Sequence, residues 1–196
     1  LDDSSIANGK IFNGITKKQS ETDAVILHVE LNKKFKLTLD TINLFEPGNG
    51  DIIRFIDKGF KVSKCSINNQ LISFAKYVKE NELDTTLPLV TYFNNNKVNV
   101  SFKDVNINED YVEFYAPVFP EVDYQLARPV GLYELEFEEI LNQRAIVPLV
   151  SCNCILNFLY ASLEGKKTGK IAGPITFGEI SHVLLNQTMV YLELKK

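Results

Sequence analysis

Hydrophobic and polar residues alternate with a period of two along much of this chain, a pattern typical of β-strands with one buried face. The clearest case is FKLTLDTI at residues 35–42. A dense apolar, β-prone run at 24–31 precedes it, and the two runs, joined by the polar residues 32–34, predict a β-hairpin. The sequence PGNG at 47–50 then predicts a break in regular structure.

Short β-prone runs continue through the middle of the chain. They lie at residues 87–93, 98–102, 111–116 and 122–127. The first two are joined by Asn94–Asn96, which suits a turn because asparagine tolerates the left-handed region. In the second run, Asn99 and Ser101 alternate with apolar residues. Short strands at short spacing with tight turns indicate antiparallel pairing.

Helical spacing of apolar residues predicts the remaining elements. One amphipathic helix is expected at 70–82, with Leu71 on its apolar face, and a second, rich in glutamate, at 132–142. A short helix is expected at 52–57, and a mostly buried one after an apolar strand at 145–150. The fold class that follows is α+β: mainly antiparallel β-sheet with three to four packed helices.

The length of 196 residues suits one domain or two small ones. If there are two parts, we expect residues 1–50 to form an N-terminal arm and β-hairpin, and residues 51–196 to form an α+β domain; the alternative is a single domain. Composition is ordinary for a globular chain, with 45% hydrophobic and 23% charged residues. A chain of this size buries about 70% of its unfolded surface, so it needs no disulfide or metal to fold.

Net charge, apolar runs and cysteine content limit the classes of partner, the compartment and the cofactors that we expect. The net charge of −4 argues against nucleic acid, because phosphate contacts need a basic face. No apolar run reaches the ~18 residues that span a bilayer. Three cysteines and no recognisable signal peptide favour a reducing compartment, so we expect a cytoplasmic location. The cysteines and two histidines form no CxxC or HxxxH pair, and we expect no metal or cofactor.

Unusual chemistry is concentrated after residue 145, where polar residues recur at the ends of apolar runs. The groups are Ser151-Cys152-Asn153-Cys154, Gly178-Glu179-Ile180 and Asn186-Gln187-Thr188. Such residues either line a pocket or satisfy the buried groups of the fold itself. The sequence alone leaves both possibilities open.

Each group has two interpretations. Cys152 is a thiol activated at a helix N-terminus or a small buried hydrophobe. Glu179 is a carboxylate paired with Arg128 or Arg144, or one aimed at a ligand amine. Asn186 contacts a ligand or satisfies the backbone of a neighbouring loop. Gly178 next to Glu179 suits a close approach of the backbone.

The order of these groups resembles the C-terminal half of the FIST sensory domain, over about residues 145–194. That family typically has a Ser-Cys element, a GEI motif and an NQT motif entering the last strand. The resemblance implies a sensory role in intracellular signal transduction and binding of a small ligand such as an amino acid. The family usually has an arginine shortly after the cysteine, and residues 155–160 contain none.

Three functions are therefore expected in order of preference. The first is a non-catalytic small-molecule-binding protein, with Cys152, Gly178, Glu179 and Asn186 in one pocket. The second is an enzyme with Cys152 as its nucleophile. The third is an interaction protein without a pocket, which uses the acidic helix face at Glu134–Glu139 or an exposed sheet edge. Sequence does not fix the ligand or the oligomeric state.

Overall fold

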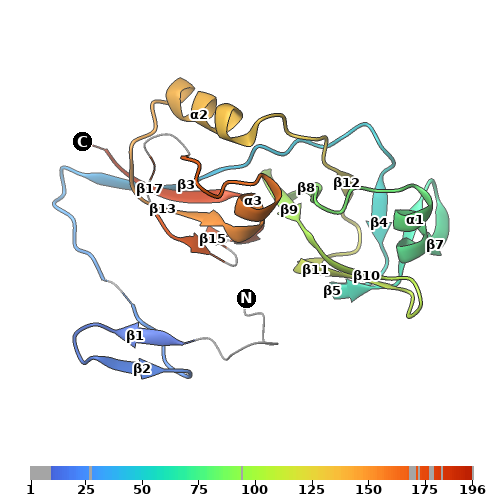
Figure 1. The fold of residues 1–196 in the computed structure, drawn as a ribbon, viewed down its shortest axis with the longest axis horizontal. Coiled ribbons are helices and arrows are strands. Elements are labelled where there is room, and N and C mark those ends of the chain that lie inside the picture. Colours follow the sequence, from blue (N-terminus) through green and yellow to red (C-terminus); the bar gives the residue numbers. More distant parts are fainter. Residues whose placement is uncertain are drawn as a thin grey trace.

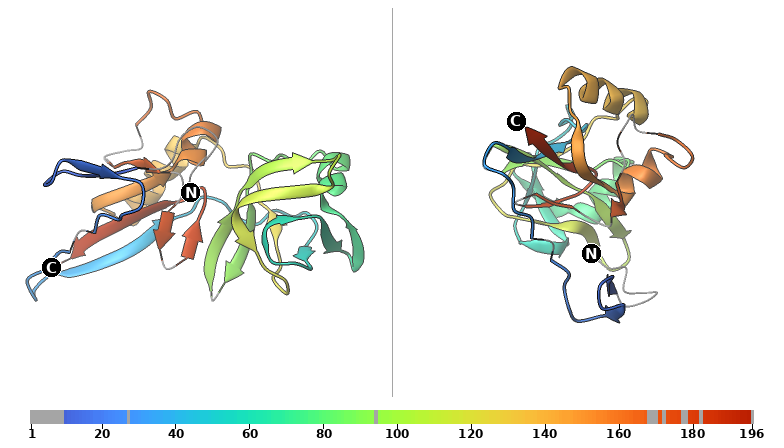
Figure 2. Two further views of the ribbon diagram at one scale, coloured as in Figure 1. Left: turned by 90° about the horizontal axis from the view of Figure 1, so that it is seen from below. Right: turned by 90° about the vertical axis from the view of Figure 1, so that its left-hand side faces the viewer.

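The computed structural model describes residues 10–26, 28–93, 95–167, 171, 173–176, 179–181 and 183–195, with only the backbone described at 179, 180 and 183. The elements form two lobes that lie side by side along the long axis of the molecule (Figure 1; Figure 2 gives two further views). The first lobe covers about residues 45–128. It interrupts the second lobe, which is built from residues 36–44 and from the chain after 129.

The first lobe is made of short antiparallel strands. They are β4 (Ile53–Phe55), β5 (Gly59–Val62), β6 (Lys64–Ile67), β7 (Gln70–Ser73), β8 (Leu89–Phe93), β9 (Asn96–Val100), β10 (Phe102–Asn106), β11 (Tyr111–Val118) and β12 (Gln125–Leu126). Three sheets result, in the orders β4-β6-β7, β10-β11-β5 and β12-β8-β9. All of these pairs are antiparallel.

A cluster of aromatic rings fills the first lobe. Helix α1 (Phe74–Glu80) begins where the Ser73 hydroxyl accepts a hydrogen bond from the Lys76 N–H. Phe74 is completely buried, and its ring meets that of Phe55 edge to face at 5.2 Å between centroids. Such pairs stabilise beyond the area they bury. This helix start therefore positions the centre of the core.

The second lobe surrounds one larger sheet. Its elements are β3 (Lys36–Ile42), α2 (Tyr133–Gln143), β13 (Pro148–Cys154), α3 (Ile155–Tyr160), β14 (Ile175–Thr176), β15 (Glu179–Ser181), β16 (Val183–Leu185) and β17 (Met189–Lys195). The sheet order is β14-β13-β17-β3, with only β14 parallel to its neighbour. β1 (Ile11–Asn13) and β2 (Lys18–Ser20) form a separate hairpin.

The two faces of this sheet are covered differently. Helix α2 lies over one face (Figure 1), where Phe137 packs in one cluster with Met189 and Tyr191. Val190 lies between these two strand residues and points to the opposite face. There the β15–β16 hairpin packs, with β15 in contact with β13, β17 and β3. Cys152 pairs with Val190 and points to the same face.

The α+β class with mainly antiparallel strands is confirmed. The expectation of three to four helices overstates the helical part, because the described residues form three short helices of 7, 11 and 6 residues. None of the helices in the described part of the chain has the length and apolar character needed to cross a bilayer.

The predicted hairpin between 24–31 and 35–42 is wrong. Residues 24–26 and 28–31 form no strand and are exposed. β3 instead pairs with β17 along its whole length. The alternating face of β3 needs a partner that also buries one face, and β17 supplies one, with Met189 and Tyr191 buried. This pairing makes residues 36–42 part of the second lobe.

The predicted helix at 52–57 is also wrong, because Ile53 and Phe55 are buried on either side of exposed Arg54 in β4. That alternation is the pattern of a strand. The helix expected at 70–82 begins only at Phe74, and Leu71 lies on β7 with 56% of its surface exposed. The strand predicted at 145–150 runs instead from Pro148 to Cys154, so Cys152 is inside a strand and not at a helix start.

Other elements agree with the predictions. The runs at 87–93 and 111–116 form strands, and Asn95 adopts a positive φ in the turn that follows the first of them. The run at 98–102 is divided between the end of β9 and the start of β10, with Ser101 between them. The helix at 132–142 is present as α2. The run at 122–127 contributes only the two residues of β12. The last strand follows the NQT sequence, as expected.

We expect Phe74→Ala to lower the free energy of unfolding by about 3–5 kcal/mol, because it empties the centre of the aromatic cluster. Leu71→Ala is the matched control and should change the free energy by less than about 0.5 kcal/mol, because Leu71 is exposed. Urea unfolding of both variants measures the difference. Equal losses would contradict the placement of Phe74 at the centre of the core and of Leu71 at the surface.

Stability should also fall at alkaline pH. Burial is the largest cause that raises the pKa of Cys65, Tyr77 and Tyr191, each to about 12. Below about pH 8 these groups are protonated in both states, so their contribution to stability is fully present. Between about pH 9 and 12 the unfolded chain loses protons first, and the free energy of unfolding declines. Urea unfolding at pH 7, 9 and 10.5 should show this decline, and Cys65→Ala should reduce it. A decline that is unchanged in this variant would contradict the role of Cys65.

Candidate functional site

Buried amide side chains join the two lobes where the chain passes from β16 to β17. Asn186, Gln187 and Thr188 fill this connection, and all three are buried. They meet Asn99 and Ser101 of the first lobe, which are also buried, at 0% and 1% exposure. The polar residues Asn99 and Ser101, at the end of β9 and just after it, are therefore covered by the other lobe.

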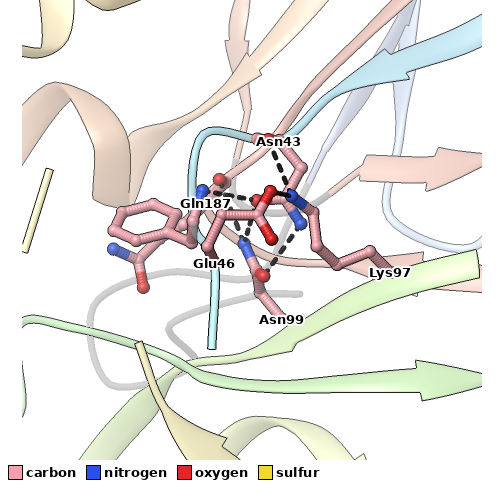
Figure 3. Close-up of polar contacts among 6 residues, drawn as sticks. Asn43, Glu46, Lys97, Asn99 and Gln187 are labelled. Carbon is pink, nitrogen blue, oxygen red and sulfur yellow. Dashed lines mark hydrogen bonds and ion pairs between the residues drawn. The ribbon is translucent and has the colours of Figure 1, made fainter. Parts of the chain in front are cut away.

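Asn99 is the centre of this amide junction (Figure 3). Its side-chain oxygen accepts a hydrogen bond from Asn43 Nδ2 at 2.9 Å, and its Nδ2 donates to Asn43 Oδ1 at 3.0 Å. The same Nδ2 lies 3.1 Å from the backbone oxygen of Asn186 and 3.4 Å from that of Gln187. One side chain thus contacts the segment before the first lobe and the segment before the last strand.

Ser101 and Gln187 form a second group of contacts. The Ser101 hydroxyl donates to Gln187 Oε1 at 2.6 Å, and Gln187 Nε2 donates to the backbone oxygen of Thr86 at 3.0 Å. The Ser101 N–H donates to Asn186 Oδ1 at 3.3 Å. Gln187 therefore spans from the edge of β10 to the turn before β8, with both ends of its amide bonded.

The backbone of Gln187 is also unusual, with φ of +47°. A non-glycine residue in this region is uncommon and is held there by its surroundings. At Gln187 those surroundings are the hydrogen bonds to Ser101 and Thr86. At the edge of the junction, Lys97 forms an ion pair with Glu46 and donates to the Asn43 backbone oxygen at 3.3 Å (Figure 3).

A cleft of about 420 Å³ opens next to this junction, between the lobes. Its lining comes from the turn at 84–87, from the chain entering α2 at 129–134, from the end of α3 with Lys166, and from Phe45 and Gln187. Ligand sites are often found between structural units, in clefts of about 300–1,000 Å³. The position and size of this cleft make it the candidate site.

The side-chain amide of Asn157 is the part of the cleft lining that points to a ligand. This α3 residue lines the cleft and is only 2% exposed. Its Nδ2 donates to Asn153 Oδ1 at 3.0 Å, but its own Oδ1 has no hydrogen-bond partner in the described structure. Buried acceptors are normally satisfied, and leaving one unpaired costs about 1–3 kcal/mol. A hydrogen-bond donor that reached the Asn157 Oδ1 would therefore be stabilising.

Charged side chains stand at the edge of the cleft. Lys166 Nζ lies 2.9 Å from Glu134 Oε1, and this hydrogen bond is the largest cause that lowers the pKa of Glu134. Asp84 is exposed, and its Oδ1 accepts bonds from the N–H and hydroxyl of Thr86. Burial raises the pKa of Tyr160, which also lines the cleft. Two carboxylates and one ammonium make this edge favourable for a ligand with a positive group.

The structure places the predicted site residues in different surroundings. Asn186 lies in the amide junction, where its Nδ2 donates to the Leu185 backbone oxygen and its Oδ1 accepts from Ser101. Cys152 is partly buried on the sheet face that the β15–β16 hairpin covers. Glu179 is in β15 of that hairpin, and its backbone pairs with Leu185. Gly178 lies outside the described residues, as does His182.

The structure thus brings the backbone that carries Glu179 near the face with Cys152, whereas the contacts of Asn186 are with Asn99 and Ser101. The interpretation that NQT satisfies neighbouring backbone groups fits its hydrogen bonds. A shared pocket for Cys152, Glu179 and Gly178 stays a prediction.

The structure also places the remaining cysteines, His28 and the acidic residues of α2. Cys65 and Cys154 are completely buried, and His28 is exposed. The described residues contain no group of three or more His, Cys, Asp or Glu side chains that could hold a metal. On α2, Glu134 bonds Lys166 and Glu136 accepts from the Gly131 N–H at 2.7 Å. These two acids therefore have local structural partners.

Sequence reasoning missed Asn157 and the function of Asn99. Asn157 sits in the apolar run ILNFLY, where one polar residue in a buried helix was the available signal. Asn99 and Ser101 alternate with apolar residues, which usually marks a solvated face. Only the tertiary contact with the NQT segment shows that this face is buried.

Comparison with known proteins identifies a family and no individual relative. A family model described as a family of unknown function (DUF6976) matches residues 1–195. Neither the curated proteins nor the solved structures contain a match.

We expect Asn99→Ala to lower the free energy of unfolding by about 3 kcal/mol, because it leaves the partly buried amide of Asn43 and the buried backbone oxygens of Asn186 and Gln187 without their partner. Asn142→Ala, on the exposed surface of α2, is the matched control and should cost less than about 0.5 kcal/mol. Urea unfolding distinguishes them. Equal effects of both variants would show that the junction contributes little to stability.

Proposed function

We propose that this chain, which belongs to the DUF6976 family, binds a small polar molecule in the cleft between its lobes and leaves it chemically unchanged. The observation that carries the proposal is that Asn157, a residue of the cleft lining, has a buried Oδ1 without a hydrogen-bond partner in the described structure. A ligand N–H or O–H that reaches this oxygen would remove the cost of leaving it unpaired.

The charges favour a ligand with an amine. Among the described residues of the cleft lining, Asp84 and Glu134 are the acids and Lys166 is the base. An ammonium group that donates a hydrogen bond to Asn157 would be attracted to the carboxylates of Asp84 and Glu134. A carboxylate on the same ligand would be attracted to Lys166. A free amino acid combines both groups, and it fits within about 420 Å³. We propose this as the ligand class.

The position of the cleft suits a sensor. Its lining includes the turn at 84–87 from the first lobe and α3 with Lys166 from the second. A ligand that contacts both would favour the arrangement of lobes that completes its contacts. Gln187 lines the cleft and also belongs to the amide junction. A role in intracellular signalling, as the resemblance to FIST domains implies, is consistent with such coupling.

This site differs from the one predicted from the sequence. It uses Asn157, Lys166 and the acids of the cleft in place of Cys152, Gly178, Glu179 and Asn186. The NQT segment still participates, but through Gln187.

Calorimetry with the twenty amino acids and simple amines tests the proposal. At least one amine-containing ligand should bind, and Asn157→Leu should weaken its binding about 10- to 100-fold, because a hydrogen bond to a charged group contributes about 1.5–3 kcal/mol. Asn142→Leu on the surface of α2 is the matched control and should leave the affinity unchanged.

Two results would contradict the proposal. One is the absence of binding by every member of the panel to a folded protein. The other is a bound ligand whose affinity is the same in the Asn157→Leu variant, provided that circular dichroism shows the variant to be folded.

A further inference from the structure

A second cavity, distinct from the inter-lobe cleft, has the opposite chemical character. It has a volume of about 240 Å³ and is lined by residues of β8, β9 and β11, by the chain at 117–124, and by Leu184 of β16. Its side chains are almost all apolar. The cavity is open at the surface, and it lies where the first lobe meets Leu184 of the second.

The polar atoms around this cavity already have partners. The Thr91 hydroxyl donates to the Asp123 backbone oxygen at 2.7 Å, and the Tyr124 hydroxyl accepts from the Phe119 N–H at 2.9 Å. Water inside a protein needs about two to four polar partners. The lining provides little for water or for a charged ligand, and filling the cavity with apolar atoms would be favourable.

Aromatic rings stand at the edge of the cavity. Phe93 and Phe119 line it, and their rings stack at 6.4 Å between centroids and 27° between planes. Both remain about half exposed, at 46% and 44%. Deeper in, Val100, Ala116 and Tyr124 belong to the core of the first lobe. The cavity therefore extends from the aromatic pair at the surface to the core.

From this lining we infer that the first lobe holds a second binding site, for a small uncharged apolar molecule about the size of an aromatic ring with a short substituent. A cavity of about 150 Å³ with an apolar lining is enough for benzene. The volume of about 240 Å³ leaves room for indole or a short alkylbenzene. The two stacked phenylalanine rings suit a flat aromatic ligand.

Indole is a suitable probe, with binding followed by NMR of the intact chain. It should bind saturably, and its ring should shift the methyl resonances of Val98, Val100 and Leu184, which line the cavity. Val122→Phe adds a ring to the lining and should weaken indole binding at least tenfold. Val105→Phe is the matched control, because Val105 is a partly buried valine of the same lobe that does not line the cavity; it should leave the affinity unchanged.

Several outcomes would overturn this site. One is the absence of saturable indole binding to the wild-type chain. Another is that indole shifts only methyl resonances of residues that do not line the cavity. Unchanged affinity in a folded Val122→Phe variant would also exclude it.

Sedimentation could instead reveal a dimer that Val122→Phe dissociates and that does not bind indole, which would assign the cavity to a second copy of the chain. If Val122→Phe does not fold, the shifts in the wild-type chain decide. Asn157→Leu should leave indole binding intact, which separates this site from the inter-lobe cleft.

Discussion

The amide junction around Asn99 is the contact on which the arrangement of the two lobes depends. The first lobe is inserted between β3 and the remaining elements of the second, so the chain crosses between the lobes near Asn43 and again after Ala127. Side-chain amides join the first of these crossings, at Asn43, and the turn at Thr86 to the connection before β17. Each buried amide has specific donors and acceptors to satisfy. A shifted arrangement of the lobes would leave several of them unpaired, so the junction selects one arrangement.

Both cavities depend on this arrangement, because the segment from Leu184 to Gln187 touches each of them. Leu184 packs against the core of the first lobe and lines the apolar cavity, whereas Gln187 lines the polar cleft. The side chains between them, Leu185 and Asn186, are buried. One connection therefore contributes a residue to a polar site and a residue to an apolar site, and each site includes residues of both lobes.

Much of the secondary structure could be predicted from local patterns, but its partners could not. The strand at 111–116 and the helix α2 have strong periodicity, and both are present. The run at 24–31 looked like a strand because of its composition, yet β3 pairs with β17, which lies about 150 residues away in the sequence. Sheet partners are decided by which faces can be buried together, and that information is not local.

The candidate site was harder to predict for the same reason. The NQT segment was recognisable as unusual, and its structural interpretation matches the observed hydrogen bonds. Asn99 and Ser101 have the pattern of a solvated strand face, and only the second lobe makes that face buried. Asn157 is one polar residue within an apolar helix, and its significance comes from a missing partner. An unmet hydrogen bond is a property of three-dimensional packing and has no signature in the sequence.

Hydrogen exchange at the Ser101 amide tests the central claim most directly. This N–H donates to Asn186 Oδ1 across the junction. If the junction holds the lobes in one arrangement, the amide should exchange only when the whole chain unfolds, with an opening free energy equal to that of global unfolding. An opening free energy several kcal/mol lower, unaffected by low concentrations of denaturant, would show that the lobes separate while each stays folded, and would contradict the account.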